Sequence, residues 1–174
     1  MESLTFEKIC VAPANSLICE LASISERAFA SSVWLDDRRH LGTLTYLISI
    51  TNFDLFVARW NGQLIGFSIG CVIDNENVTQ FGKASQLELW LGGYLLAWAA
   101  VLPEFRNMGI GSELLKLRIL ASAHCQVVYA VTRHDNYHAL RLYRKNGLEL
   151  FKTINCYGRK GLYSLCWYRR YWDR

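Results

Sequence analysis

The feature of this 174-residue chain that most restricts its fold is an uninterrupted apolar run, GYLLAWAAVL, which is followed directly by Pro103. The run belongs to a longer stretch without a charged residue, from Leu89 to Pro103. A strand that is covered on both faces of a sheet has this composition. The stretch has about fifteen residues and contains Gly92 and Gly93, whereas a membrane-spanning helix needs about twenty. We therefore predict a buried central strand.

A glycine-rich turn, EFRNMGIGSELL, follows this strand and leads into a helical sequence. A helix N-terminus has unpaired N–H groups and the positive end of the helix dipole, so it attracts anions. Glycine lets the backbone approach a ligand closely. We predict that the amides from Met108 to Ser112 surround a phosphate pair, with Arg106 adding positive charge and Ser112 either capping the helix or donating to the phosphate. A tight turn without a ligand is the alternative.

Two other phosphate-binding motifs do not fit this turn. The P-loop requires Gly-Lys-Ser/Thr, which is absent here. The dinucleotide-binding fingerprint requires a third Gly or Ala, and Leu114 stands at that place. The turn therefore needs another explanation.

Periodicity and turn residues predict the remaining elements. Residues 14–29 repeat apolar positions at helical spacing, with Asn15 or Ser16 as the candidate cap. Asn61-Gly62 joins two strands of a hairpin in residues 53–73. The other predicted elements are helices in 41–50, 111–124 and 136–147 and strands in 126–131, 148–157 and 162–170. This order predicts one α/β sandwich domain, residues 1–174, with a mixed sheet.

Cysteines, charge and the first residues narrow the class of protein. None of the six cysteines forms a CxxC pair, so we predict buried thiols rather than disulfides or a zinc site.

The net charge is +4, and cations gather near the C-terminus: Arg159, Lys160, Arg169, Arg170 and Arg174. We interpret them as a solvated basic surface, with nucleic-acid binding as the alternative. The first residues, MESLTFEK, show no signal pattern, and we expect a cytoplasmic protein.

Two motifs give the chain a specific resemblance. The segment VLPEFRNMGIGSELL resembles the acetyl-CoA-binding signature of the GNAT superfamily, Arg/Gln-x-x-Gly-x-Gly/Ala, through Arg106, Gly109 and Gly111. A second segment, NYHALRLYRKNGLE, resembles a later element of the same superfamily. Its matching residues are Asn136, Ala139, Leu142, Tyr143, Gly147 and Leu148.

The resemblance implies a fold and an activity. It implies a single GNAT-like domain with a mixed, mostly antiparallel sheet and helices on both faces. It also implies an N-acetyltransferase that moves an acetyl group from acetyl-CoA to a primary amine of a small molecule or protein. The residues expected to contact acetyl-CoA are Ala99, Ala100, Val101, Arg106, Asn107, Met108, Gly109, Ile110, Gly111, Ser112, Asn136, Ala139 and Tyr143.

The implied mechanism is direct attack of the amine on the thioester. A backbone N–H near Ala100 or Val101 would stabilise the oxyanion, and Tyr143 would protonate the leaving thiolate as general acid. Relatives often carry a glutamate as general base where this chain has Leu95 and Val131. The other candidates are Glu88, Glu104, His134 and Asp135, and a water chain is equally compatible. No base is therefore assigned. No metal is expected, and an acyl-enzyme on Cys125 is disfavoured because no His–Asp pair is visible beside it.

The acceptor is left open. By resemblance it lies near the first two helices, their charged loop Asp36–His40 and the last strands. The candidate tryptophans for an apolar acceptor pocket are Trp34, Trp60, Trp90 and Trp98. No nucleic-acid or membrane partner is expected, and both monomer and homodimer are compatible with the sequence. The alternative function is a non-catalytic CoA-binding or interaction module.

Overall fold

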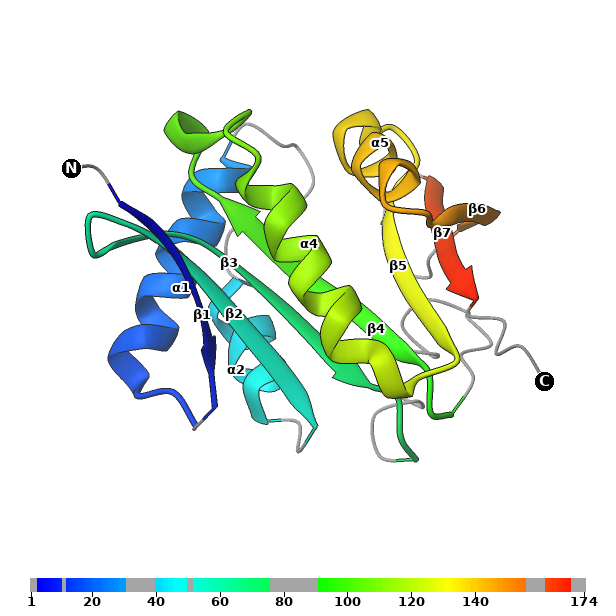
Figure 1. Cartoon of the computed structure of the whole chain (residues 1–174), viewed down its shortest axis with the longest axis horizontal. Helices are drawn as coiled ribbons and strands as arrows, with labels where there is room; N and C mark the ends of the chain where they lie inside the picture. The colour runs from blue at the N-terminus through cyan, green and yellow to red at the C-terminus, as the bar shows by residue number, and fades with distance from the viewer. Residues whose placement is uncertain are drawn as a thin grey trace. The chain divides into compact units, whose positions relative to one another are not determined.

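The computed structural model describes residues 3–10, 12–30, 40–49, 52–75, 91–155 and 162–169. Figure 1 labels most of the elements. In chain order the elements are β1 (Leu4–Ile9), α1 (Asn15–Phe29), α2 (His40–Ser49), β2 (Phe53–Trp60), β3 (Gln63–Val72), β4 (Tyr94–Val101), the 3-10 turn η1 (Pro103–Phe105), α4 (Ile110–Ala121), the 3-10 turn η2 (Ser122–His124), β5 (Val127–Arg133), α5 (Tyr137–Lys145), β6 (Glu149–Asn155) and β7 (Leu162–Arg169).

The described strands form one mixed sheet of seven strands in the order β1-β2-β3-β4-β5-β7-β6. β1 pairs antiparallel with β2, and β7 pairs antiparallel with both β5 and β6. β4 and β5 run parallel. The predicted mixed, mostly antiparallel sheet is confirmed.

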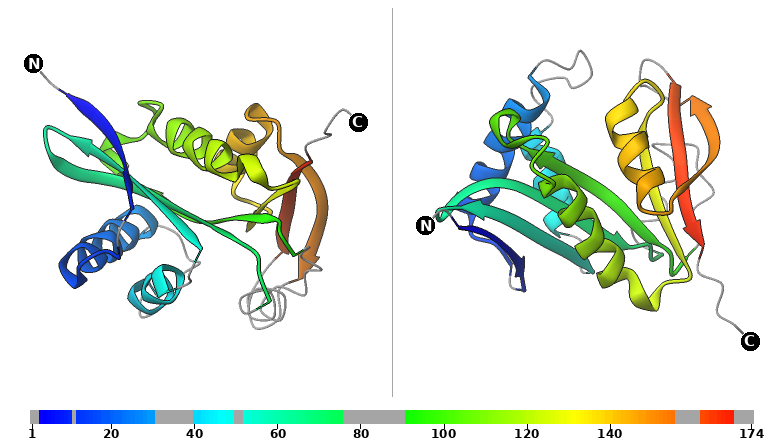
Figure 2. Two further views of the ribbon diagram at one scale, coloured as in Figure 1. Left: turned by 60° about the horizontal axis from the view of Figure 1, so that its bottom comes forward. Right: turned by 45° about the horizontal axis from the view of Figure 1, so that its top comes forward.

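The chain divides into two compact units. The first comprises Met1–Gly70 and Trp98–Arg118, and the second comprises Cys71–Ala97 and Ile119–Arg174. In the first unit, α1 and α2 lie on one face of β2 and β3, and α4 lies on the opposite face (Figure 2). In the second unit, α5 packs against β5 and β6.

The core of the first unit follows the predicted patterns. α1 buries Leu21, Ile24 and Ala28, which repeat at helical spacing. β3 is buried on both faces from Leu64 to Cys71. The hairpin turn between β2 and β3 has Asn61 and Gly62 at positive φ, 50° and 82°. This combination is typical of a type I′ turn, whose twist matches that of the paired strands.

Three sequence predictions were wrong. β1 was missed because it is an edge strand whose best-covered side chains are only half-buried, so its alternation is weak. The N-cap of α1 is Ala14, with no side-chain cap, rather than Asn15 or Ser16. Cys10 and Cys19 are exposed, so the buried-thiol interpretation holds only for Cys71 and Cys125 among the cysteines whose side chains are described.

The α4 helix provides a direct test of this packing. Leu114 is fully buried, whereas Leu120 of the same helix is 69% exposed. We expect Leu114→Ala to lower the free energy of unfolding by about 2–5 kcal/mol, because it removes buried apolar contacts and leaves a cavity. The matched change Leu120→Ala should alter it by less than about 0.5 kcal/mol. Equal effects of the two changes in urea denaturation would contradict this placement of α4.

Candidate functional site

The glycine turn between β4 and α4 has the backbone geometry that its sequence predicts. η1 covers Pro103–Phe105, and the Arg106 N–H donates to the Pro103 carbonyl at 3.2 Å. Asn107 and Gly109 then adopt positive φ values of 64° and 81°. Glycine adopts such angles without steric cost, and asparagine tolerates them better than most residues. The turn therefore needs the residue types that the sequence supplies.

Gly109 ends the turn and caps α4. Its carbonyl accepts from the N–H groups of Ser112 and Glu113 at 3.0 and 3.1 Å. The amides of Ile110 and Gly111, the first two residues of α4, have no carbonyl partner within the helix. They are the donors that an anion would use at this end. Ser112 is the third residue of α4 and is not its N-cap, so that part of the sequence prediction was wrong.

Two contacts link the glycine turn to the last turn of α1. The Arg106 guanidinium donates through Nη2 to the Ala28 carbonyl. Arg27 Nη2 forms a 2.6 Å ion pair with Glu104 Oε1. The first contact satisfies one of the carbonyls that a helix C-terminus leaves unpaired. A guanidinium has five N–H donors, so Arg106 retains donors for another acceptor.

β4, the strand before this turn, contains one residue more than β3 opposite it. The Leu102 N–H donates to the Ile65 carbonyl at 2.9 Å, and the Ile73 N–H donates to the Gly93 carbonyl at 2.7 Å. β3 advances eight residues between these bonds, from Ile65 to Ile73, whereas the β4 segment advances nine, from Gly93 to Leu102. One extra residue on one strand of an antiparallel pair is a β-bulge.

The three β4 residues predicted to contact acetyl-CoA differ in exposure. Ala99 is exposed, Ala100 is buried and Val101 is half-buried. A Cβ added to Gly66 in β3 would lie 3.0 Å from the Ala100 carbonyl oxygen, so the two backbones are unusually close here. The Cα register of β4 with β5 extends only from Tyr94 to Leu96.

The second predicted motif lies in the other unit, at the start of α5 and along it. Asn136 is the N-cap, because its Oδ1 accepts from the Ala139 N–H at 3.2 Å. Its Nδ2 donates to Thr132 Oγ1 at 3.1 Å. Gly147 follows the helix with φ 84°. Tyr143 is half-buried on α5. The predicted helix boundaries at Asn136 and Gly147 are confirmed.

The candidates for the general base lie in different surroundings. Glu104 is held in the ion pair with Arg27. Asp135 accepts from Arg133 Nε and Nη2, both at 2.9 Å, and these hydrogen bonds lower the pKa of its carboxyl. His134 is exposed in the turn before α5. Leu95 is buried and Val131 is half-buried, while Glu88 lies outside the described residues.

Trp60 and Trp98 are partly buried in packing contacts. The Trp98 ring stacks edge-on against Phe29, with centroids 6.1 Å apart, and its Nε1 donates to Ser25 Oγ at 2.9 Å. The Trp60 ring lies 6.2 Å from that of Phe105. The other acceptor-side candidates, Trp34, Trp90 and residues 36–39, lie outside the described residues, as does the side chain of His40.

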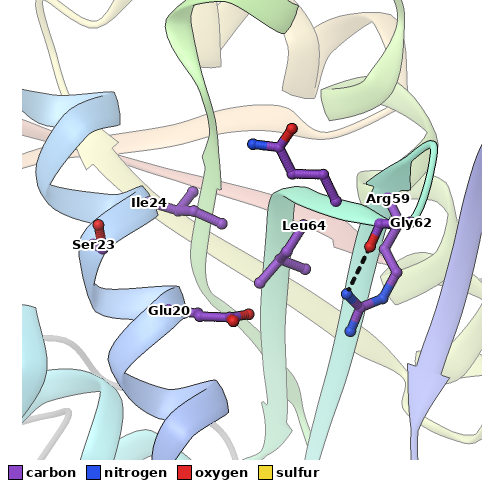
Figure 3. A pocket seen from close by; sticks show the side chains of 7 residues that line it. Glu20, Ser23, Ile24, Arg59, Gly62 and Leu64 are labelled. Carbon is purple, nitrogen blue, oxygen red and sulfur yellow. Dashed lines mark hydrogen bonds between the residues drawn. The ribbon is translucent and has the colours of Figure 1, made fainter.

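A separate hollow of about 300 Å³ lies between α1 and the β2–β3 hairpin (Figure 3). Its lining residues are Glu20, Ser23, Ile24, Arg59, Gly62, Gln63 and Leu64. Arg59 Nη1 donates to the Gly62 carbonyl at 3.2 Å across one wall. None of the predicted site residues lines this hollow, so it is not the predicted acetyl-CoA site.

Several further predictions concern features beyond this site. The described residues include no group of three or more His, Cys, Asp or Glu that could hold a metal ion. No helix in the described ranges has the length and apolar character needed to cross a membrane. Arg159, Lys160, Arg170 and Arg174 of the basic C-terminus lie outside the described residues, and so does the side chain of Arg169.

One buried arginine was not predicted from the sequence. Arg118 of α4 is only 2% exposed. Its Nε donates to the Leu114 carbonyl, and its Nη1 donates to the carbonyls of Ile69 in β3 and Trp98 in β4, each at 3.4 Å. The signal was present in the sequence, because Arg118 stands four residues after the apolar Leu114 and so shares its helix face.

Comparisons with known proteins agree with the motifs. Residues 19–148 match the model of the Acetyltransferase (GNAT) family. A search of curated protein sequences finds no match to this chain. Many solved structures share its fold.

Three of these structures illustrate the likeness. An acetyltransferase of the GNAT family from Streptococcus pneumoniae has a TM-score of 0.67 and 16% identity, covering 97% of this chain and 100% of its own. The ribosomal-protein-S18-alanine N-acetyltransferase from Escherichia coli has a TM-score of 0.68 and 16% identity, covering 97% and 94%. A Corynebacterium glutamicum protein described as histone acetyltransferase HPA2 and related acetyltransferase has a TM-score of 0.72 and 18% identity, covering 98% of each chain.

At these identities the structural likeness establishes the fold, and the family match establishes the kind of enzyme. The matched region contains both the glycine turn at α4 and the Asn136–Leu148 element. The chain belongs to the GNAT family of acetyltransferases and is an acyltransferase.

Proposed function

We propose that this protein is an N-acetyltransferase that moves the acetyl group of acetyl-CoA directly to a primary amine of a small molecule or protein. The observation that carries the proposal is the capped glycine turn at the start of α4. Gly109 closes the turn at positive φ, and the Ile110 and Gly111 amides lack helical partners. Donors arranged in this way suit the pyrophosphate of a coenzyme.

The reaction assigns a task to each predicted group. The amine nitrogen attacks the thioester carbonyl carbon, the C–S bond breaks, and the amine loses a proton. A backbone N–H in the Ala99–Val101 segment donates to the carbonyl oxygen as it gains charge. Tyr143 donates its phenolic proton to the leaving thiolate, a role that suits a group with an ordinary pKa near 10.

The remaining predicted residues bind the coenzyme. Arg106 and the amides from Asn107 to Ser112 hold the pyrophosphate, and Asn136 and Ala139 contact the coenzyme near α5. Two structural relatives carry names that refer to proteins as acceptors, ribosomal-protein S18 alanine and histone. A protein amine is therefore one acceptor class to screen, alongside small amines. The protein works in the cytoplasm as a monomer or homodimer, without a metal.

Binding of acetyl-CoA is the first test. In calorimetric titration we expect acetyl-CoA and CoA to bind and NADH not to bind. Gly111→Glu should weaken acetyl-CoA binding about tenfold or more, because it places a like charge beside the phosphates. Leu120→Glu adds the same charge at an exposed position near the other end of α4 and should leave binding unchanged. No binding to the wild-type protein would overturn the proposal. Binding without acetyl transfer to any amine would instead indicate a non-catalytic CoA-binding module.

Tyr143→Phe tests the general acid. It should lower kcat by about a hundredfold or more, since general acid catalysis typically contributes that much, while the affinity for acetyl-CoA stays near the wild-type value. Tyr137→Phe removes a hydroxyl from a 74% exposed tyrosine of the same helix and serves as the control. The assay follows release of the CoA thiol with the best amine found by screening. A wild-type rate across the pH range for Tyr143→Phe would remove Tyr143 from the mechanism.

The Asp135 carboxyl is expected to be ionised throughout the working range. Hydrogen bonds from Arg133 lower its pKa from the usual 3.8, so its contribution to stability is present above that value and is lost as the pH falls through the lowered pKa. In an NMR titration, Arg133→Met should raise the Asp135 pKa toward 3.8. An unchanged pKa would show that the Arg133 contact does not form in solution.

A further inference from the structure

We propose that the exposed face of α5 binds single-stranded nucleic acid, a partner that the sequence did not lead us to expect. The helix exposes five residues, Tyr137, His138, Arg141, Arg144 and Lys145. With 3.6 residues per turn, these five fall within about a third of the helix circumference. α5 contains no acidic residue. The inference goes beyond acetyl transfer, because the proposed reaction gives none of these residues a task.

The three cations of this face differ from most other cations that the structure describes. Ion pairs with a carboxylate, at 2.6 to 3.6 Å, are formed by Lys8, Arg27, Arg59, Lys116 and Arg133. Over the same described ranges the α5 cations form no ion pair. Their charge is therefore available to a partner.

The acidic residues next to α5 in the sequence do not neutralise this face. Asp135 lies just before the helix, and its carboxylate accepts two hydrogen bonds from Arg133, both at 2.9 Å. Glu149 begins β6 and forms no ion pair within the part of the chain that is described. The exposed face of α5 thus keeps its full positive charge.

The positions of the cations on the helix favour a role in binding over a role in folding. A helix C-terminus stabilises cations in its last turn, where Arg144 and Lys145 stand. Arg141 lies before that turn, where this effect has faded. Arg141 and Lys145 are four residues apart, and like charges at that spacing destabilise a helix slightly. Such an arrangement suits a partner that carries several negative charges.

An exposed aromatic ring distinguishes nucleic acid from other polyanions. Tyr137 is 74% exposed, more than any other large hydrophobic side chain described. It stands four residues before Arg141 and seven before Arg144, so the three share one stripe of the helix. Proteins that bind single strands combine cations along the backbone with rings on which bases stack. An acidic peptide needs the cations but has no base to stack on the ring.

Fluorescence anisotropy of a labelled oligouridylate of roughly ten nucleotides, titrated with the protein at rising NaCl concentration, tests the proposal. The logarithm of the binding constant should fall with the logarithm of the salt concentration with a slope of about −2. Three cations neutralise about three phosphates, and each contributes about −0.7 on a single strand. Arg141→Gln should make the slope shallower by about 0.7. Replacing Arg141, Arg144 and Lys145 together by Gln should abolish binding.

Variants of Tyr137 separate stacking from charge. Tyr137→Ala should weaken binding about fivefold or more without changing the slope, because it removes a stacked ring and no charge. Tyr137→Phe keeps the ring and should bind like the wild-type protein. Lys116→Gln removes one charge from an exposed, ion-paired position on α4, and should leave the affinity and the slope near their wild-type values.

Three results would overturn the proposal. One is no salt-dependent binding of the oligouridylate, or binding that persists when the three cations are replaced. Another is equally tight binding of polyglutamate together with no effect of Tyr137→Ala, which would indicate an acidic protein partner. The third is displacement of the oligouridylate by acetyl-CoA, which would show that these cations serve the phosphates of the coenzyme. Retention of the oligouridylate at saturating acetyl-CoA is the expected result.

Discussion

The structure of the first unit depends on the pairing of buried backbone groups in β4. A peptide group that is removed from water must find a partner, or it costs much of a small protein's net stability. β4 is apolar along almost its whole length and contains one residue more than β3 opposite it. Within β4 the Trp98 carbonyl also accepts from a buried side chain, that of Arg118 on α4, at 3.4 Å. A charged residue in the core is therefore part of how this strand is built.

The same constraint connects the fold to the chemistry. The bulged strand β4 ends at Val101, and the glycine turn that leads into α4 follows within a few residues. α1 contacts both parts, through Ser25 and Phe29 at Trp98 and through Arg27 and Ala28 at the turn. Groups proposed to bind the acetyl carbonyl and the pyrophosphate are thus held by one helix. Rigid elements of this kind keep reacting groups in a productive geometry.

Much of the fold could be predicted from the sequence because its signals are local. The Asn61-Gly62 turn, the apolar run before Pro103 and the ends of α5 at the Asn136 cap and at Gly147 each depend on neighbouring residues, and the structure confirms them. β1 escaped prediction because an edge strand with half-buried side chains shows only faint alternation. The predicted N-cap of α1 was also wrong. Asn15 and Ser16 are both suitable cap residues, but the helix already begins at Asn15 and its N-cap is Ala14.

For the candidate site, the sequence by itself determined the glycine turn, the Asn136–Leu148 element and, through them, the family. These motifs are contiguous, and each constrains its own backbone through glycine conformation or helix capping. Only the tertiary structure decided the β4 bulge, the partners of Arg118 and the contact of Arg106 with Ala28. These features join residues far apart in the chain, such as Ile69, Trp98 and Arg118. Their hydrogen bonds exist only after packing has brought the strands and helices together, so no local pattern encodes them.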